Sequence, residues 1–122
     1  MPTRALEPDL AAAYVHELSA DVRGVVVLGP DGERLAGPEA MAGPARALAA
    51  EIDGDAILRL PGGMVWLTRG QGRTLIAAAG PAAQAGPTFL DARAAIGAAP
   101  PTSIPRPVEA RSAAASDVLS AT

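Results

Sequence analysis

AILRLPGGMVWLTRGQGRTLIAAA, residues 56–79, contains three short apolar runs with two glycine-containing breaks between them. The runs are Ala56 to Leu60, Met64 to Arg69 and Arg73 to Ala79, and the breaks are Pro61-Gly62-Gly63 and Gly70-Gln71-Gly72. Breaks of this length and composition are typical of tight turns between antiparallel strands. The stretch therefore predicts a three-stranded antiparallel meander.

The three runs differ in how deeply we expect them to be buried. Leu75 to Ala79 is apolar at every position, as is typical of a strand covered on both faces of a sheet. Ala56 to Leu60 is short and carries Arg59, which favours an edge position. The meander thus predicts one central and one edge strand.

A second set of strands precedes the meander. Val25 to Leu28 is a continuous apolar run, and it leads into the turn sequence Gly29-Pro30-Asp31-Gly32. Proline fixes φ at the second turn position, and glycine tolerates a positive φ at the exit. Residues 33–36 then return as a short partner strand, so this region predicts a hairpin whose first strand is central.

Three alanine-rich segments have apolar residues at helical spacing, and they predict helices over 8–20, 44–52 and 88–96. Because proline disfavours a helix interior, we expect the second helix to begin regularly near Pro44, with a looser turn before it. Ala45, Leu48, Ala49 and Ile52 form an apolar stripe along one face of this helix. Arg46 and Glu51 lie on other faces. In the last helix we expect Asp91 and Arg93 to point outward.

The composition changes after residue 97. Residues 98–122 contain four prolines and many serines and alanines, with few large apolar side chains to offset the entropy cost of ordering. We therefore predict one folded domain over 1–97 and a disordered Pro/Ala/Ser-rich tail over 98–122.

Composition also restricts the chemistry of the protein. The 122 residues include one histidine, no cysteine and no lysine, so most nucleophiles, bases and metal ligands are scarce. His16 has no second histidine or cysteine with which to share a metal, and Asp53 and Asp55 read as solvated loop carboxylates. We predict that the protein is not an enzyme and that it uses no cofactor and no metal.

Charge and hydropathy give further expectations about partners and location. The net charge of −3 and the scattered arginines give no attraction to nucleic acid. The longest uncharged stretch, residues 74–90, is interrupted by two Gly-Pro pairs and cannot form one membrane-spanning helix. With no secretory signal pattern, we expect a cytoplasmic location.

The element order, together with Arg23 to Gly32, Trp66-Leu67-Thr68 and Thr74-Leu75-Ile76, resembles the roadblock / dynein light chain domain in its bacterial branch. The resemblance covers about residues 8–97. It implies a profilin-like α+β fold, α-β-β-α-β-β-β-α, with a five-stranded antiparallel sheet in the order 2-1-5-4-3 and helices on both faces.

The same resemblance implies a homodimer in which the third strand pairs with its symmetry mate and the second helices pack together. The corresponding dimer-interface residues here are Ala45, Leu48, Ala49, Ile52, Ile57, Leu58 and Arg59. A partner protein would dock on the same helix, with Arg46 and Glu51 as the contacting residues.

Two functions remain open from the sequence. The resemblance implies a non-enzymatic homodimeric regulator or scaffold that binds a Ras-like small GTPase or a related signalling partner. The alternative is a small-molecule or signal-sensing domain on a profilin-like sheet. A sensor needs a polar group inside an apolar cavity, and the candidates are His16, Thr68 and Thr74.

Overall fold

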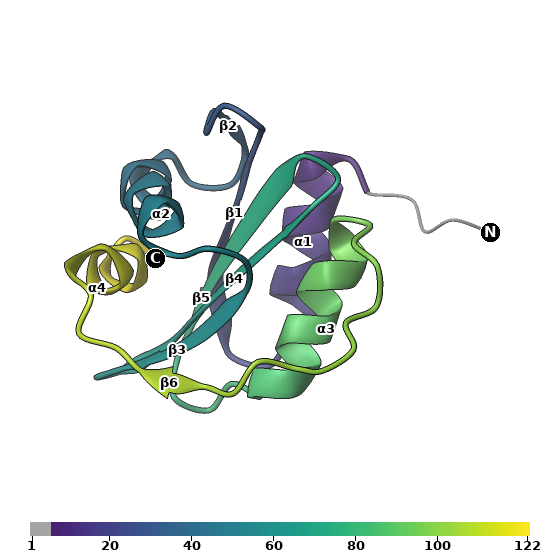
Figure 1. Cartoon of the computed structure of the whole chain (residues 1–122). Helices are drawn as coiled ribbons and strands as arrows, with labels where there is room; N and C mark the ends of the chain where they lie inside the picture. The colour runs from purple at the N-terminus through teal and green to yellow at the C-terminus, as the bar shows by residue number, and fades with distance from the viewer. Residues whose placement is uncertain (1–5) are drawn as a thin grey trace.

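The computed structural model describes residues 6–122, which form three layers: a six-stranded sheet with two helices on each face (Figure 1). Helices α1 and α3 lie on one face, and α2 and α4 lie on the other. In chain order the elements are α1 (Pro8–Leu18), β1 (Val22–Leu28), β2 (Arg34–Ala36), α2 (Glu39–Glu51), β3 (Ala56–Leu60), β4 (Gly63–Gly70), β5 (Arg73–Ala79), α3 (Ala85–Ala95), β6 (Val108–Glu109) and α4 (Ala113–Ser120).

The sheet has the strand order β2-β1-β5-β4-β3-β6. From β2 to β3 in this order, neighbouring strands are antiparallel. Ile76 of the central strand β5 pairs with Val26 of β1 on one side and with Leu67 of β4 on the other. The predicted order 2-1-5-4-3 and the α+β class are therefore confirmed. The structure adds β6, which pairs in parallel with β3 at the edge.

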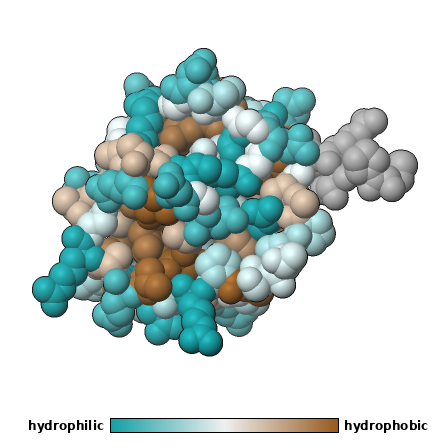
Figure 2. All heavy atoms as spheres, viewed as in Figure 1, coloured by the Kyte–Doolittle hydropathy of each residue, from teal (hydrophilic) through white to brown (hydrophobic). Residues whose placement is uncertain are grey.

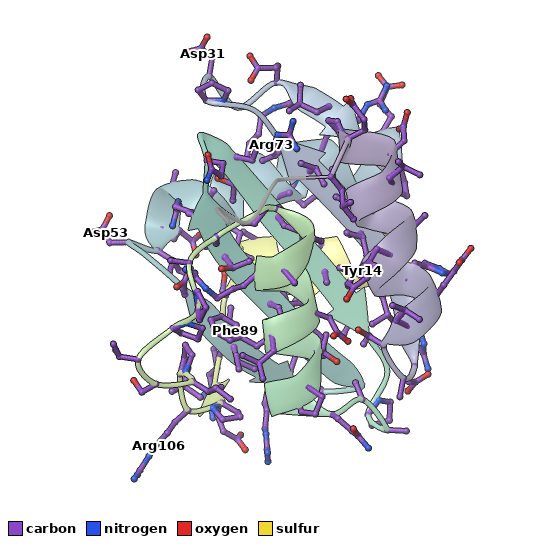
Figure 3. All side chains as sticks on the ribbon, turned by 90° about the vertical axis from the view of Figure 1, so that its right-hand side faces the viewer. Tyr14, Asp31, Asp53, Arg73, Phe89 and Arg106 are labelled. Atoms are coloured by element: carbon purple, nitrogen blue, oxygen red, sulfur yellow. The ribbon has the colours of Figure 1, made fainter. Side chains whose placement is uncertain are left out.

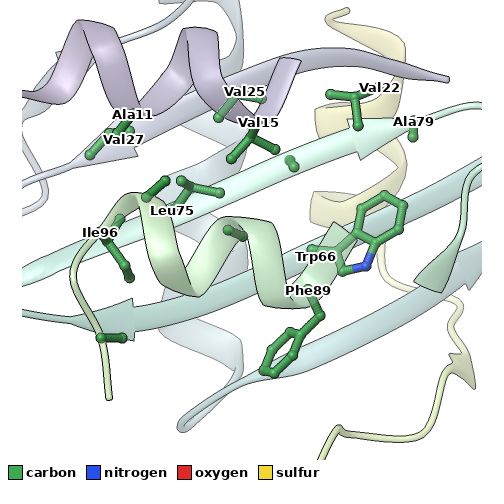
Figure 4. Close-up of a cluster of buried hydrophobic side chains, with 14 of the residues drawn as sticks. Ala11, Val15, Val22, Val25, Val27, Trp66, Leu75, Ala79, Phe89 and Ile96 are labelled. Carbon is green, nitrogen blue, oxygen red and sulfur yellow. The ribbon is translucent and has the colours of Figure 1, made fainter. Parts of the chain in front are cut away.

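Side chains alternate between the two faces of the sheet and separate the core into two clusters. The cluster under α1 and α3 holds the two largest buried side chains, Trp66 and Phe89 (Figure 4). The indole Nε1 of Trp66 donates a hydrogen bond to the backbone oxygen of Ala85, 3.0 Å away, so its polar group is satisfied at the start of α3.

The cluster under α2 and α4 is aliphatic. Its buried members include Met41 and Leu48 from α2, Leu58 and Val65 from the sheet, and Val118 from α4. Among the strands, α2 mainly contacts β1, whereas α4 mainly contacts β4, β3 and β5. Each helix thus covers a different part of this face.

Helix α2 begins earlier than predicted. It runs from Glu39 through Pro44, so the expected looser turn before Pro44 is wrong. Proline lacks the N–H that would donate to the carbonyl of Ala40, four residues earlier. Because Met41 and Ala42 are buried in the first turn, packing stabilises this part of the helix despite the missing bond.

The expectation of a disordered tail also differs from the structure. Residues 108–109 form β6, and residues 113–120 form α4, which packs beside α2 (Figure 1). Ala114, Ala115 and Val118 are buried against the part of the sheet that α2 leaves uncovered. These small side chains fit a shallow space, and a count of large apolar residues underestimates how much surface they cover.

None of the helices within residues 6–122 combines the length and the apolar character needed to cross a bilayer.

Candidate interaction surface

The predicted interface residues of α2 divide into two groups. Ala45 and Leu48 are fully buried against the sheet of their own chain. Ala49 and Ile52 are half-buried at the margin of the aliphatic cluster. Of this stripe, only Ala49 and Ile52 are positioned to contact another molecule while the helix stays in place.

The three predicted interface residues of β3 have different environments. Ile57 is fully buried in the cluster under α1 and α3, and Leu58 faces the opposite cluster with 6% of its surface exposed. Arg59 is exposed and pairs in register with Glu109 of β6. The backbone N–H of Ala110 donates to the oxygen of Arg59 over 2.9 Å, so the outer edge of β3 is occupied by the chain itself.

The two predicted partner-binding residues are exposed, and both bond to their own chain. Arg46 Nε donates to the backbone oxygen of Gly32 in the β1–β2 turn. Glu51 Oε2 accepts a hydrogen bond from Ser112 Oγ at 2.9 Å. Glu51 therefore connects the end of α2 to the C-terminal segment.

We call residues 99–122 the strap, because they run from one face of the sheet to the other around the β3 edge (Figure 1). Ile104 lies over the start of α3, where a Cβ added at Gly86 would be 3.6 Å from its Cδ1 atom. After β6 the strap continues into α4. It ends with Thr122 beside Gly24 of β1, where an added Cβ would be 2.9 Å from Thr122 Cγ2.

A polar network lies where the strap begins, and it corrects the expectations for two residues. Arg93 was expected to point outward, yet only 13% of its side chain is exposed and its Nη1 lies 2.9 Å from Asp55 Oδ2. Asp55 was expected to be a solvated loop carboxylate. Its Oδ1 instead accepts hydrogen bonds from Thr68 Oγ1 at 2.9 Å and from the backbone N–H of Arg69 at 3.0 Å.

The same arginine connects the network to the strap. Arg93 Nε and Nη2 donate to the backbone oxygen of Ala99 at 3.1 and 2.8 Å, and its guanidinium carbon is 5.9 Å from the centroid of the Phe89 ring. Both oxygens of Asp55 already have partners in this network. The arrangement is suited to anchoring the strap rather than to acid-base chemistry.

The polar candidates for a sensing site are not gathered in one cavity. Thr68 is fully buried and bonded within the network, whereas His16 is exposed. His16 lines a pocket of about 340 Å³ between α1 and β1, and Thr74 lines another of about 380 Å³ near the β1–β2 turn. Within residues 6–122, no three His, Asp or Glu side chains gather as a metal site.

Two polar arrangements that hold the strap were missed by sequence reasoning. Ser112 accepts a hydrogen bond from the N–H of Ala115 at 3.1 Å and so caps α4, in addition to its bond with Glu51. A serine directly before an alanine-rich run is a recognisable helix N-cap signal. The pairing of Asp55 with Arg93 has no such local signal, because the two residues are 38 positions apart.

Comparison with solved structures identifies the fold. The structure matches a Roadblock/LC7 domain from Streptomyces avermitilis with a TM-score of 0.59, over 71% of this chain and 88% of that one. The chain has the Roadblock/LC7 fold. At 16% sequence identity the likeness shows the Roadblock/LC7 fold alone. No protein-family model and no curated protein matches the sequence.

Proposed function

We propose that this Roadblock/LC7-fold chain is a non-enzymatic regulator or scaffold of the roadblock family that acts as a homodimer in the cytoplasm. Its partner would be a Ras-like small GTPase or a related signalling protein. The observation that carries the proposal is the combination of this fold with a sheet edge and an aliphatic half-face that the folded core, residues 6–98, leaves uncovered.

The uncovered half-face lies over β3 and β4. Leu58, Leu60, Val65 and Leu67 belong to the aliphatic cluster, and α2 does not extend over all of them, because its main strand contacts are with β1. An open strand edge beside an apolar surface is prone to pair with another chain. A two-fold axis at this edge would cover both features at once.

Within residues 6–122, the partly buried ion pair of Asp55 and Arg93 makes structural contacts, which supports a binding role. The carboxylate of Asp55 and the guanidinium of Arg93 are occupied by each other and by their neighbours. His16 is exposed and lines an open pocket together with Glu17 and Arg23, and no serine, threonine or tyrosine of residues 6–122 lines that pocket. Affinity for a protein partner would therefore come from shape, apolar contact and the exposed charges of α2.

The first experiment measures the solution mass of the full chain by light scattering over a concentration series. We expect a concentration-dependent dimer that is weakened by Ala49→Glu, because Ala49 lies at the margin of the aliphatic cluster. Ala50→Glu adds the same charge one position along the helix at an exposed site and serves as the matched control. Equal dimerisation of both variants would remove α2 from the proposed interface.

The partner is tested by analytical size exclusion with a purified bacterial Ras-like GTPase, loaded either with GDP or with a non-hydrolysable GTP analogue. We expect one nucleotide state to co-elute with the chain, and we expect Arg46→Ala and Glu51→Ala to weaken that complex. Arg106→Ala removes an exposed charge outside the proposed surface and is the control (Figure 3). No complex in either nucleotide state would contradict a GTPase partner.

A further inference from the structure

The strap occupies the surface that the proposed dimer needs. β6 is bonded to the outer edge of β3, and α4 lies over β3 and β4 beside α2. Leu58 and Leu48, two of the predicted interface residues, belong to the aliphatic cluster that α4 completes. A second copy therefore cannot reach this edge and half-face while the strap is docked.

The strap is held by a short strand pair, an exposed hydrogen bond and the small buried side chains of α4. β6 has two residues, and Val108 remains 51% exposed. The Ser112–Glu51 hydrogen bond is exposed to solvent, where water competes for both groups. Helix α4 has eight residues, too short to be stable in isolation, and it buries Ala114, Ala115 and Val118.

The connection between the anchor and the docked part allows movement. Ala99 is held by Arg93, and residues 100–107 contain four prolines and form neither a helix nor a strand. Eight residues span up to roughly 28 Å when extended. β6 and α4 can therefore leave the sheet while the start of the strap stays attached.

A second copy can replace the strap with better strand pairing. β6 pairs with β3 in parallel over two residues. A two-fold related β3 would pair in antiparallel over as many as the five residues of this strand, and antiparallel pairs are the more stable kind per residue. The apolar half-face of the second copy would also cover the half-face of the first. Hydrophobic side chains remain visible between hydrophilic ones left of the centre in Figure 2, even with the strap docked.

We propose that the strap is an intramolecular cap that competes with a second copy of the chain for the β3 edge and its half-face, so that strap release controls dimerisation. The inference rests on the proposed homodimer and adds its regulation. A strap docked about nine-tenths of the time weakens apparent dimerisation about a hundredfold, since both copies must be open and each is open about one-tenth of the time.

The test uses one variant that releases the strap and one that locks it. Val118→Asp places a charge at a fully buried position of α4, and Ser116→Asp places the same charge at an exposed position of that helix as the control. Arg59→Cys with Glu109→Cys puts two thiols on in-register residues of β3 and β6. The natural chain has no cysteine, so oxidation with diamide and reduction with dithiothreitol act on this pair alone.

Strap position and oligomeric state are read separately. Trypsin reports the strap, because the chain has no lysine, Arg106 precedes a proline that blocks cleavage, and Arg111 lies between β6 and α4. Light scattering reports the mass. Fluorescence of Trp66, which lies on the opposite face of the sheet, reports whether each variant stays folded.

We expect Val118→Asp to be cleaved faster at Arg111 and to dimerise about a hundredfold more tightly than Ser116→Asp, because the strap is released in both copies. The oxidised cysteine pair should stay monomeric and regain dimerisation on reduction. If the cysteine pair dimerises equally well when oxidised and when reduced, the strap does not cap the interface, and the proposed homodimer is still supported. A folded Val118→Asp chain that is cleaved rapidly yet stays monomeric overturns the proposed homodimer at this face.

Discussion

The two faces of the sheet are covered by different means. On one face, α1 and α3 lie side by side over a cluster that contains Trp66 and Phe89 (Figure 3). On the other, α2 covers the part near β1, and the remainder is covered by α4 from the C-terminal strap. The first face buries large aromatic side chains, whereas the strap contributes mainly alanines and one valine.

This difference indicates which part of the molecule can open locally and exchange its packing contacts. Large buried side chains contribute more to the free energy of unfolding than small ones, because more apolar area leaves water. Segments with few buried apolar contacts open locally at a lower free-energy cost than the core. We therefore expect the α1/α3 face to remain folded under conditions in which the strap already opens.

The largest expected effect is at Trp66. Trp66→Ala removes a fully buried indole and its hydrogen bond to Ala85, and it should lower the free energy of unfolding by about 3–5 kcal/mol. Urea denaturation followed by circular dichroism measures the change. Leu18→Ala on the exposed side of α1 is the control, and a similar loss there would contradict a core concentrated at Trp66.

The next effect concerns the network at the start of the strap. Asp55→Ala and Arg93→Ala should each cost about 1–3 kcal/mol, because each leaves a partly buried charged partner without the hydrogen bond that joins the pair. The double variant should cost less than the sum of the two single ones. Additive losses in this double-mutant cycle would show that the two side chains do not stabilise the fold as a pair.

A smaller and more local effect is expected at Val118. Val118→Ala removes two buried methyl groups and should cost about 1–3 kcal/mol, chiefly by opening α4. Hydrogen exchange should speed up at amides in residues 113–120 and stay unchanged in β1 and β5. Equal acceleration in β5 would mean that the strap and the sheet unfold as one cooperative unit.

The smallest effect is expected at the cap of α4. Ser112→Ala removes the acceptor for the N–H of Ala115 and should weaken the helix by about 1 kcal/mol. Ser116→Ala changes an exposed serine in the same helix and is the control. Hydrogen exchange of the Ala115 amide measures the difference, and equal exchange in both variants would show that the serine cap does not stabilise α4.

Much of the fold was predictable because its signals are local. Apolar runs broken by glycine turns predicted β1, β3, β4 and β5, and Gly32, Gly62 and Gly72 take the positive φ values that such turns require. The interface residues were harder, since their burial depends on what covers them. Ile57 was predicted at an interface, and it lies in the interior of its own chain, because residues 56–60 alternate between two covered faces.

The sequence by itself determined strands β1 to β5, their turns and the three helices among them, because these depend on neighbouring residues. Only the tertiary structure decided where residues 99–122 go. Ala114, Ala115 and Val118 are too small to order a segment alone, yet they fit the space that α2 leaves open over the sheet. Packing between distant parts of the chain therefore stabilises the strap, which local composition cannot predict.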